Sequence, residues 1–275
     1  MHRLRVYTAI VFVPFFFILV KYFHPIAFTS FLLVGILLAQ YEYFRLHSHE
    51  RMSVVSTIVA AVISIGFVFS FYHGHHASLA IGLIGMASVV SLGYLVTYIR
   101  GRVGRSAGPI IILFGVLYIG WMLGHLVLLR GLECGVALIF FVFFVTWASD
   151  ITAYYVGSSF GRRKLAPTIS PGKTIEGAVA GLVGSVIASL ISKLLFMPAL
   201  DLHHYLIVGL LLGVVGQAGD LFESRLKRHV GVKDSGTLLP GHGGMLDRAD
   251  SLIFTAPVYY YYIVTFTDMS KGTCI

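Results

Sequence analysis

The chain has 275 residues, of which 57% are hydrophobic and only 12% are charged, and its formal net charge is +8. Ordinary soluble domains have about 25% charged residues. The composition therefore excludes a typical soluble domain and indicates an integral membrane protein, for which we expect no nucleic-acid partner.

Apolar runs recur along the whole chain, and many reach the length of about 20 residues that a helix needs to cross a bilayer. The first run follows Arg3 and Arg5, which makes a cleaved signal peptide the alternative. No small-x-small cleavage site follows Lys21, so we predict an uncleaved first helix. The fold class predicted is an all-α polytopic integral membrane protein with about nine transmembrane helices. The predicted spans are roughly 6–22, 25–41, 53–72, 77–99, 108–129, 132–155, 175–197, 203–221 and 251–268.

We divide the chain into two regions on this pattern. Residues 1–107 hold about four spans, and residues 108–275 hold about five, together with the polar stretches 156–174 and 222–250. Glycines in two of the spans have a spacing that suits close helix packing in lipid. They are Gly82, Gly85 and Gly93, and then Gly177, Gly181 and Gly184.

The distribution of basic residues predicts the orientation. With the N-terminus inside, sixteen of the 20 Lys and Arg residues fall in cytoplasmic segments. Positive charge marks the cytoplasmic side of membrane proteins. We therefore predict a cytoplasmic N-terminus and an external C-terminus. Cys134 and Cys274 fall on the predicted outer side, where a disulfide is the alternative, but we expect two unrelated membrane-facing thiols.

Ionisable residues gather at one depth in this topology. Asp150 ends the sixth span, Lys173 precedes the seventh and Asp220 ends the eighth, while Asp247 and Asp250 precede the ninth. Ionisable residues near a span are costly and are functional candidates. We expect these groups to meet at the cytoplasmic face.

Each candidate also has a simpler interpretation. Asp220, Ser224 and Lys227 share one helical face with Glu223, but basic residues at a helix end can merely extend to the headgroups and water. Asp247 and Asp250 start a helix, where aspartate commonly caps the backbone. We expect one of the two to act as a cap and at least one to do more.

The stretch "GHGGMLDRAD" places His242 among glycines, and such a backbone can form a concave anion-binding nest. "GKT" at 172–174 lacks the earlier glycine of a phosphate loop and follows no predicted strand, so a P-loop is rejected. Lys173 at a helix start can still meet phosphate as a point charge. Carboxylates with Lys, Arg and glycine-rich backbone indicate metal-dependent phosphate chemistry, and Mg²⁺ binds through one or two carboxylates.

Residues 224–250, "SRLKRHVGVKDSGTLLPGHGGMLDRAD", resemble the signature of the phosphatidate cytidylyltransferase (CDP-diacylglycerol synthase) family, and 149–177 resemble a second common stretch. Two positions depart from that pattern: Gly172 stands where the family usually has a second Lys, and Ala249 replaces a bulkier apolar residue. The matching positions are Ser224, Lys227, Arg228, Lys233, Asp234, Gly236, Pro240, His242, Gly243, Gly244, Asp247, Arg248 and Asp250.

The resemblance implies transfer of CMP from CTP to phosphatidate, which yields CDP-diacylglycerol and pyrophosphate. It further implies that Asp220 and Asp247 hold Mg²⁺, with a second cation, K⁺ being one option. His242 is either a phosphate donor or a loop organiser, and Asp234 either serves the site or pairs with Lys233. Asp150 and Asp250 are expected to orient substrate or support the ligands. The residues expected at the phosphates are Lys173, Ser224, Arg225, Lys227, Arg228, Lys233, Gly243, Gly244 and Arg248.

Several alternatives remain open. The acceptor can be an ether or isoprenoid analogue of phosphatidate, which the motifs do not distinguish. A transporter is a different class, but transporters place ionisable residues near the midplane. The cluster of His73, His75 and His76 is expected to be an incidental polar turn. A homodimer is plausible, and the expected location is a bacterial inner membrane with the site facing the cytoplasm.

Overall fold

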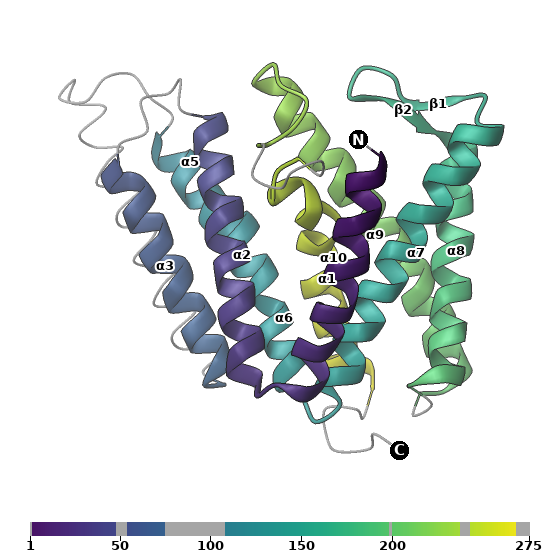
Figure 1. Cartoon of the computed structure of the whole chain (residues 1–275), viewed down its shortest axis with the longest axis horizontal. Coiled ribbons are helices and arrows are strands. Elements are labelled where there is room, and N and C mark those ends of the chain that lie inside the picture. Colours follow the sequence, from purple (N-terminus) through teal and green to yellow (C-terminus); the bar gives the residue numbers. More distant parts are fainter. Residues whose placement is uncertain (1, 48–53, 75–107, 198–199, 237–242, 268–275) are drawn as a thin grey trace. The chain divides into compact units, whose positions relative to one another are not determined.

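The computed structural model describes residues 2–47, 54–74, 108–197, 200–236 and 243–267. Figure 1 shows that the described chain is helical almost throughout, with one small hairpin. The chain divides into two compact units. Unit 1 comprises Met1–Leu128 and Asp234–Arg248, and unit 2 comprises Leu129–Lys233 and Ala249–Ile275.

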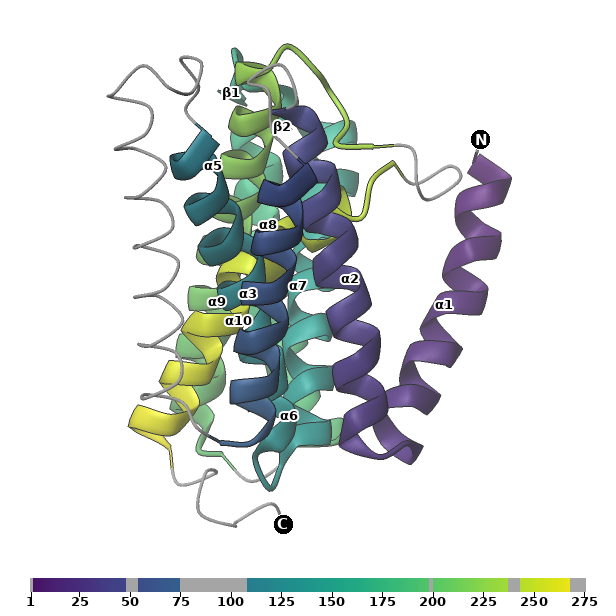
Figure 2. The ribbon, with the colours of Figure 1, turned by 90° about the vertical axis from the view of Figure 1, so that its left-hand side faces the viewer.

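Unit 1 is built mainly from the N-terminal helices. Helix α2 begins at Pro25, because the fixed φ of proline suits the first helical position, and Nδ1 of His24 accepts a hydrogen bond from the N–H of Ile26. Figure 2 shows α1 leaving the short connection to α2 and diverging from it. The elements are α1 (His2–Tyr22), α2 (Pro25–Leu46), α3 (Val54–Tyr72), α5 (Gly108–Gly115), the π-helix Val116–Trp121 and most of α6 (Met122–Gly131).

A buried polar contact ties α2 to two neighbouring elements of unit 1. Nε2 of Gln40 donates to Oγ of Ser64 at 2.7 Å and to the carbonyl oxygen of Gly115 at 3.3 Å. A Cβ on Gly115 would lie 2.8 Å from the ring of Tyr43. Glycine therefore allows the helix backbone to approach α2 closely enough for Gln40 to reach it.

Unit 2 packs its long helices through small residues. A Cβ on Gly177 would lie 2.7 Å from the carbonyl oxygen of Ala153, and one on Gly181 would lie 2.7 Å from Nε2 of Gln217. A Cβ on Gly184 would collide with Thr152. The packing role predicted for these three glycines is confirmed. The elements are α7 (Gly135–Phe160), β1 (Lys164–Ala166), β2 (Ser170–Thr174), α8 (Ile175–Leu195), α9 (Leu202–His229) and most of α10 (Leu246–Phe266).

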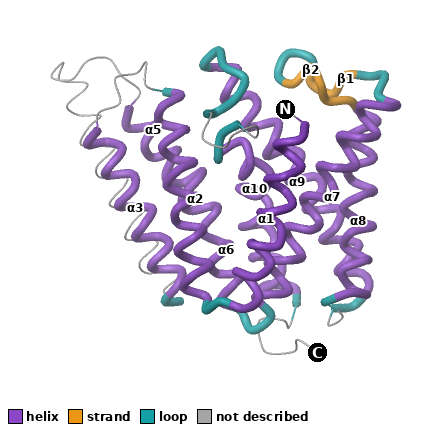
Figure 3. The backbone as a smooth tube through the Cα atoms, viewed as in Figure 1, coloured by secondary structure: helices purple, strands orange, loops and turns teal. Residues whose placement is uncertain are grey.

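Strands β1 and β2 form an antiparallel hairpin between α7 and α8, drawn in orange in Figure 3. The sequence predicted a loop here. Ala166 and Ser170 each precede a proline, which disfavours helical backbone and favours the extended conformation. The carboxylate of Glu176 accepts hydrogen bonds from the N–H groups of Arg162 and Arg163, at 3.0 Å for Arg162. The start of α8 is thereby fixed to the end of α7.

Five helices of the described chain are long and apolar enough to cross a membrane: Pro25–Leu46, Ile111–Gly131, Gly135–Phe160, Ile175–Leu195 and Leu202–His229. The chain is therefore a helical membrane protein. The predicted helix 77–99 lies outside the described residues, as do His75, His76 and the glycines predicted to pack in that helix. The total of nine spans and the division near residue 107 stay predictions.

Several helices extend beyond the predicted spans. Helix α9 continues to His229, eight residues beyond the predicted end, and α7 continues to Phe160. The predicted loops 156–174 and 222–250 therefore begin with helical residues. In 222–229 the Glu, Lys and Arg residues favour helix about as well as Leu does. Cys134 is disulfide-bonded, so the expectation of separate thiols is also wrong at this position; Cys274 lies outside the described residues.

The closest backbone approach of α8 and α9 can be tested at Gly209. A Cβ there would lie 2.8 Å from Cα of Val186, and backbone cannot move aside as a flexible side chain can. We expect Gly209→Leu to lower stability by about 1–3 kcal/mol or more, because overpacking forces the helices apart. The measurement is the apparent melting temperature in detergent. Leu210→Ala is the control, since Leu210 is half exposed. Equal shifts in both variants would contradict the packing role.

Candidate functional site

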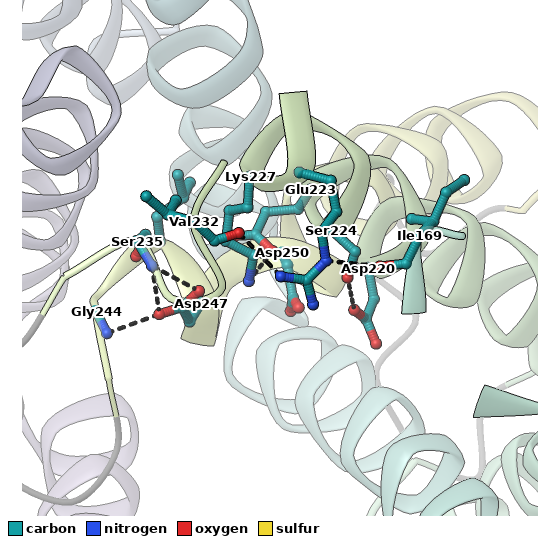
Figure 4. Close-up of polar contacts among 12 residues, drawn as sticks. Ile169, Asp220, Glu223, Ser224, Lys227, Val232, Ser235, Gly244, Asp247 and Asp250 are labelled. Carbon is teal, nitrogen blue, oxygen red and sulfur yellow. Dashed lines mark hydrogen bonds and ion pairs between the residues drawn. The ribbon is translucent and has the colours of Figure 1, made fainter. Parts of the chain in front are cut away.

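The first group of polar residues lies in unit 2, where β2 meets α9. Nζ of Lys173 lies 2.7 Å from Oδ2 of Asp220, and both side chains remain partly exposed, at 26% and 31%. Oγ of Ser224, one turn further along α9, lies 3.4 Å from Oδ1 of Asp220. The pair joins the segment 149–177 to α9, four residues before the segment 224–250 begins. Figure 4 shows the α9 residues of this group.

A second ion pair lies on the next turn of α9. Glu223 is fully buried, and its Oε2 lies 2.6 Å from Nζ of Lys227. A buried carboxylate needs a charged or hydrogen-bonding partner, since its isolated ionised form is costly. Lys227 therefore has a fixed partner in this structure. The sequence placed Glu223 on one helical face with Asp220 and Lys227 but did not predict that it is buried.

Carboxylates gather around this part of α9. Asp250 on α10 interacts electrostatically with Asp220, Glu223 and Asp150. The carbonyl oxygen of Asp250 would lie 2.8 Å from a Cβ on Gly219. The glycine thus permits the close approach of α9 and α10 at the level of the acids.

Arg228 has a different environment from the one expected. Its Nε donates to the carbonyl oxygen of Ile169 at 3.1 Å, and its Nη1 donates to the carbonyl oxygen of Val232 at 2.9 Å. These bonds connect the end of α9 to the β1–β2 turn. In this structure the guanidinium group of Arg228 therefore holds the hairpin.

The third feature lies in unit 1, around the start of α10. Oδ2 of Asp247 accepts hydrogen bonds from the N–H groups of Gly244, at 2.8 Å, and Ser235, at 3.0 Å. The carboxylate reaches back over the helix start in the manner of a capping box. Gly243 has φ of +83°, and a Cβ there would lie 2.9 Å from Oδ2 of Asp247. Glycine is needed at this position for both reasons.

Glu42 on α2 belongs to the same cluster and was not predicted. It is 3% exposed, and its Oε2 accepts hydrogen bonds at 2.9 Å from Oγ of Ser235 and from the N–H of Leu246. Its sequence distance from these partners exceeds 190 residues. No local pattern relates residues so far apart, so only the fold reveals the contact.

The structure thus brings together the predicted residues Asp150, Lys173, Asp220 and Asp250 in unit 2. In unit 1 it brings together Asp247 and Gly244, with Gly243 beside them. His242 lies outside the described residues. The predicted phosphate-binding residues Arg225, Lys233 and Arg248 are exposed, as is Asp234.

The donor set suits Mg²⁺ bound through few protein ligands. Among the residues that the structure describes, no three Asp, Glu, His or Cys side chains form a metal-binding group. Mg²⁺ does not require one, because it keeps several waters and binds through one or two carboxylates and substrate phosphates. Asp220 fits this mode, since its carboxylate is partly exposed and contacts the Lys173 ammonium and the Ser224 hydroxyl among the described residues.

A model of the cytidylyltransferase family matches residues 3–266. "Uncharacterized protein YnbB" of Escherichia coli (strain K12) is 52% identical over 132 residues, which are 48% of this chain and 44% of that protein. The "Phosphatidate cytidylyltransferase" of Bacillus subtilis (strain 168) is 44% identical over 144 residues, 52% of this chain and 54% of that one. The "Phosphatidate cytidylyltransferase" of Synechocystis sp. (strain ATCC 27184 / PCC 6803 / Kazusa) is 47% identical over 131 residues, which are 47% of this chain and 44% of that protein. The chain spans about half the length of these relatives.

The backbone contacts of Asp247 lead to a stability prediction. Asp247→Ala removes the acceptor of the Gly244 and Ser235 amides and should cost about 1–3 kcal/mol, as expected for lost bonds to a charged group. Asp247→Asn keeps a carbonyl acceptor and should cost less. Apparent melting temperatures in detergent measure both variants. If Asn and Ala lower the melting temperature equally, the carboxylate does not stabilise the helix start in this way.

Proposed function

This chain belongs to the cytidylyltransferase family, and from that membership we propose that it transfers the CMP group of CTP to phosphatidate, in a step of phospholipid biosynthesis. The observation that carries the proposal is the ion pair between Lys173 and Asp220. It joins the segment 149–177 to α9 just before the segment 224–250, and a cation that can bind phosphate beside a carboxylate that can bind a metal ion suits nucleotide transfer.

The reaction exchanges one phosphoanhydride linkage for another. A phosphate oxygen of phosphatidate attacks the α-phosphorus of CTP, the bond from that phosphorus to the bridging oxygen of the β-phosphate breaks, and pyrophosphate leaves. A phosphomonoester is largely ionised at neutral pH, with a second pKa of about 6, so no protein base has to remove a proton. Positioning and charge neutralisation supply the catalysis.

Lys173 has the capacity to bind phosphate while it remains paired. Its ammonium group has three donors, and Asp220 is a close carboxylate partner. Nζ itself is buried although the side chain is partly exposed, so phosphate contact through the remaining donors requires Nζ to be uncovered. The carboxylate of Asp220 keeps the ammonium at this point and so orients it before substrate binds.

The glycine-rich segment supplies backbone rather than side chains. Gly243 and Gly244 lie beside Asp247, and backbone without side chains lets a phosphate approach closely. The exposed Arg225, Lys233 and Arg248 are proposed to meet CTP or lipid phosphates. Lys227 is proposed as a further phosphate contact, with the buried Glu223 holding it in place.

We propose Mg²⁺ as the cofactor, held by Asp220 and Asp247, with a second cation such as K⁺ beside it. When bound, such cations neutralise charge on the attacking and leaving phosphate oxygens. His242 is proposed either to donate to phosphate or to organise the loop.

The activity can be tested by label transfer. Purified protein in detergent, given phosphatidate, Mg²⁺ and CTP labelled in the α-phosphate, should form a labelled lipid. Addition of EDTA should abolish the product, and Asp220→Asn should lower kcat/KM by about 100-fold or more, as expected for a lost charge contact in phosphoryl transfer.

Asp201→Asn is the matched control, because Asp201 is an exposed aspartate at the opposite end of the same helix and makes no capping bond. Absence of labelled lipid from folded protein with phosphatidate, with or without K⁺, would contradict the proposal. Product formed only with an ether-linked analogue would indicate the alternative acceptor. Substrate movement into vesicles without any product would indicate a transporter.

The orientation is a second proposal. Helix α9 has 28 residues and is about 42 Å long at 1.5 Å per residue, whereas the hydrocarbon core is about 30 Å thick. If the helix enters the core at Leu202, it leaves the core near Asp220. We propose that the Asp220 end and the β1–β2 hairpin face the cytoplasm, in a bacterial inner membrane.

Cysteine labelling tests this orientation. In a chain with Cys134 and Cys274 replaced by serine, Leu165→Cys on the hairpin should react with an impermeant maleimide only from the cytoplasmic side. Asp201→Cys should react only from the outside. Labelling in inverted vesicles measures access from the cytoplasmic side, and labelling in right-side-out vesicles measures access from the outside. Labelling of Leu165→Cys from the outside and of Asp201→Cys from the cytoplasmic side would overturn the orientation.

A further inference from the structure

Glu42 is a buried carboxylate in a part of the chain where the sequence shows only apolar helices and no catalytic motif. It lies near the end of α2 and is 3% exposed. An ionisable group in such a place is costly unless it has specific partners. Its partners therefore indicate why this position holds a carboxylate.

Both hydrogen-bond donors to Glu42 come from the segment that follows residue 233. The hydroxyl of Ser235 and the N–H of Leu246 each donate to Oε2 at 2.9 Å. Ser235 and Leu246 lie on either side of the glycine-rich stretch, so one carboxylate oxygen joins the beginning of that stretch to its end.

The segment has a composition that allows this close approach. A Cβ on Gly236 would lie 2.7 Å from Oε1 of Glu42, and a Cβ on Gly244 would collide with Oε2 and with Oγ of Ser235. Two glycines of the motif are thus required by the carboxylate on α2. Oε1 has no hydrogen-bond partner among the residues that the structure describes.

Ser235 connects Glu42 with Asp247. Its hydroxyl donates to Glu42, while its N–H donates to Asp247 at 3.0 Å. Leu246, the other partner of Glu42, is adjacent to Asp247 in the chain. A displacement of Glu42 would therefore move Ser235 and Leu246, and with them the hydrogen bonds and the backbone that orient the carboxylate of Asp247.

We propose that Glu42 is a positioning residue, which holds Ser235 and Leu246 so that the Asp247 carboxylate keeps its orientation for the reaction. The catalytic part of this inference rests on the proposed cytidylyltransferase activity, whereas the structural part does not. Glu42 acts through Ser235 and Leu246 and touches neither substrate.

Hydrogen exchange tests the structural part without any assay of activity. Glu42→Ala should raise exchange at the amides of Ser235, Gly244 and Leu246 by about tenfold, because protection depends on the lost hydrogen bonds. Glu42→Gln keeps one carbonyl acceptor and should give a smaller rise in exchange. This second variant keeps the test valid if Glu42→Ala fails to fold.

Gln40→Ala is the matched control. Gln40 is buried on the same helix two residues away, but its partners are Ser64 and Gly115. It should lower the melting temperature while leaving exchange at the three amides unchanged. Unchanged exchange in both Glu42 variants, or an equal rise in Gln40→Ala, would overturn the proposal.

Kinetics then test the catalytic part. Glu42→Gln should lower kcat by about tenfold at saturating CTP and phosphatidate, and Gln40→Ala should leave kcat per folded molecule unchanged. A wild-type protein without activity would contradict the proposed function and leave the exchange result to decide the structural role. An active Glu42→Gln with normal kcat but raised exchange would overturn the link to catalysis.

Discussion

The ion pair between Lys173 and Asp220 is the constraint on which the site in unit 2 depends. Lys173 lies on β2 and Asp220 on α9, so the hairpin must be held against the end of a long helix for the pair to form. Glu176 and Arg228 both serve this arrangement through bonds to backbone atoms. Both charged groups hold the hairpin, and the partly exposed Lys173 is positioned as a result.

The sequence predicted most of the helices because membrane spans are long and apolar, and that signal is local. It also predicted the close packing at Gly177, Gly181 and Gly184, since small residues at helical spacing have few other uses in a span. It missed the β1–β2 hairpin and the extension of α9 to His229. Polar residues end a span without ending a helix, so hydropathy marks only the membrane boundary.

The candidate site was predicted unevenly for a similar reason. Asp220, Asp247 and Lys173 were found because charged residues are rare in this chain and lie in recognisable motifs. The pairing of Glu223 with Lys227 and the backbone contacts of Arg228 depend on burial and on tertiary structure. A motif therefore indicates which residues take part, while the fold decides which of them are available to a substrate.

Glu42 shows where local reasoning ends. Its neighbours in the sequence are aromatic and apolar, and a lone acid near a helix end has an ordinary interpretation as a group that reaches water. The structure gives it four neighbours from residues 235–246. Ser235 and Leu246 donate hydrogen bonds to it, and Gly236 and Gly244 leave room for it. Glycines of a motif suited to phosphate binding thus also make room for this carboxylate. Glycines in such a motif can thus be required by a neighbouring side chain of the protein as well as by a bound ligand.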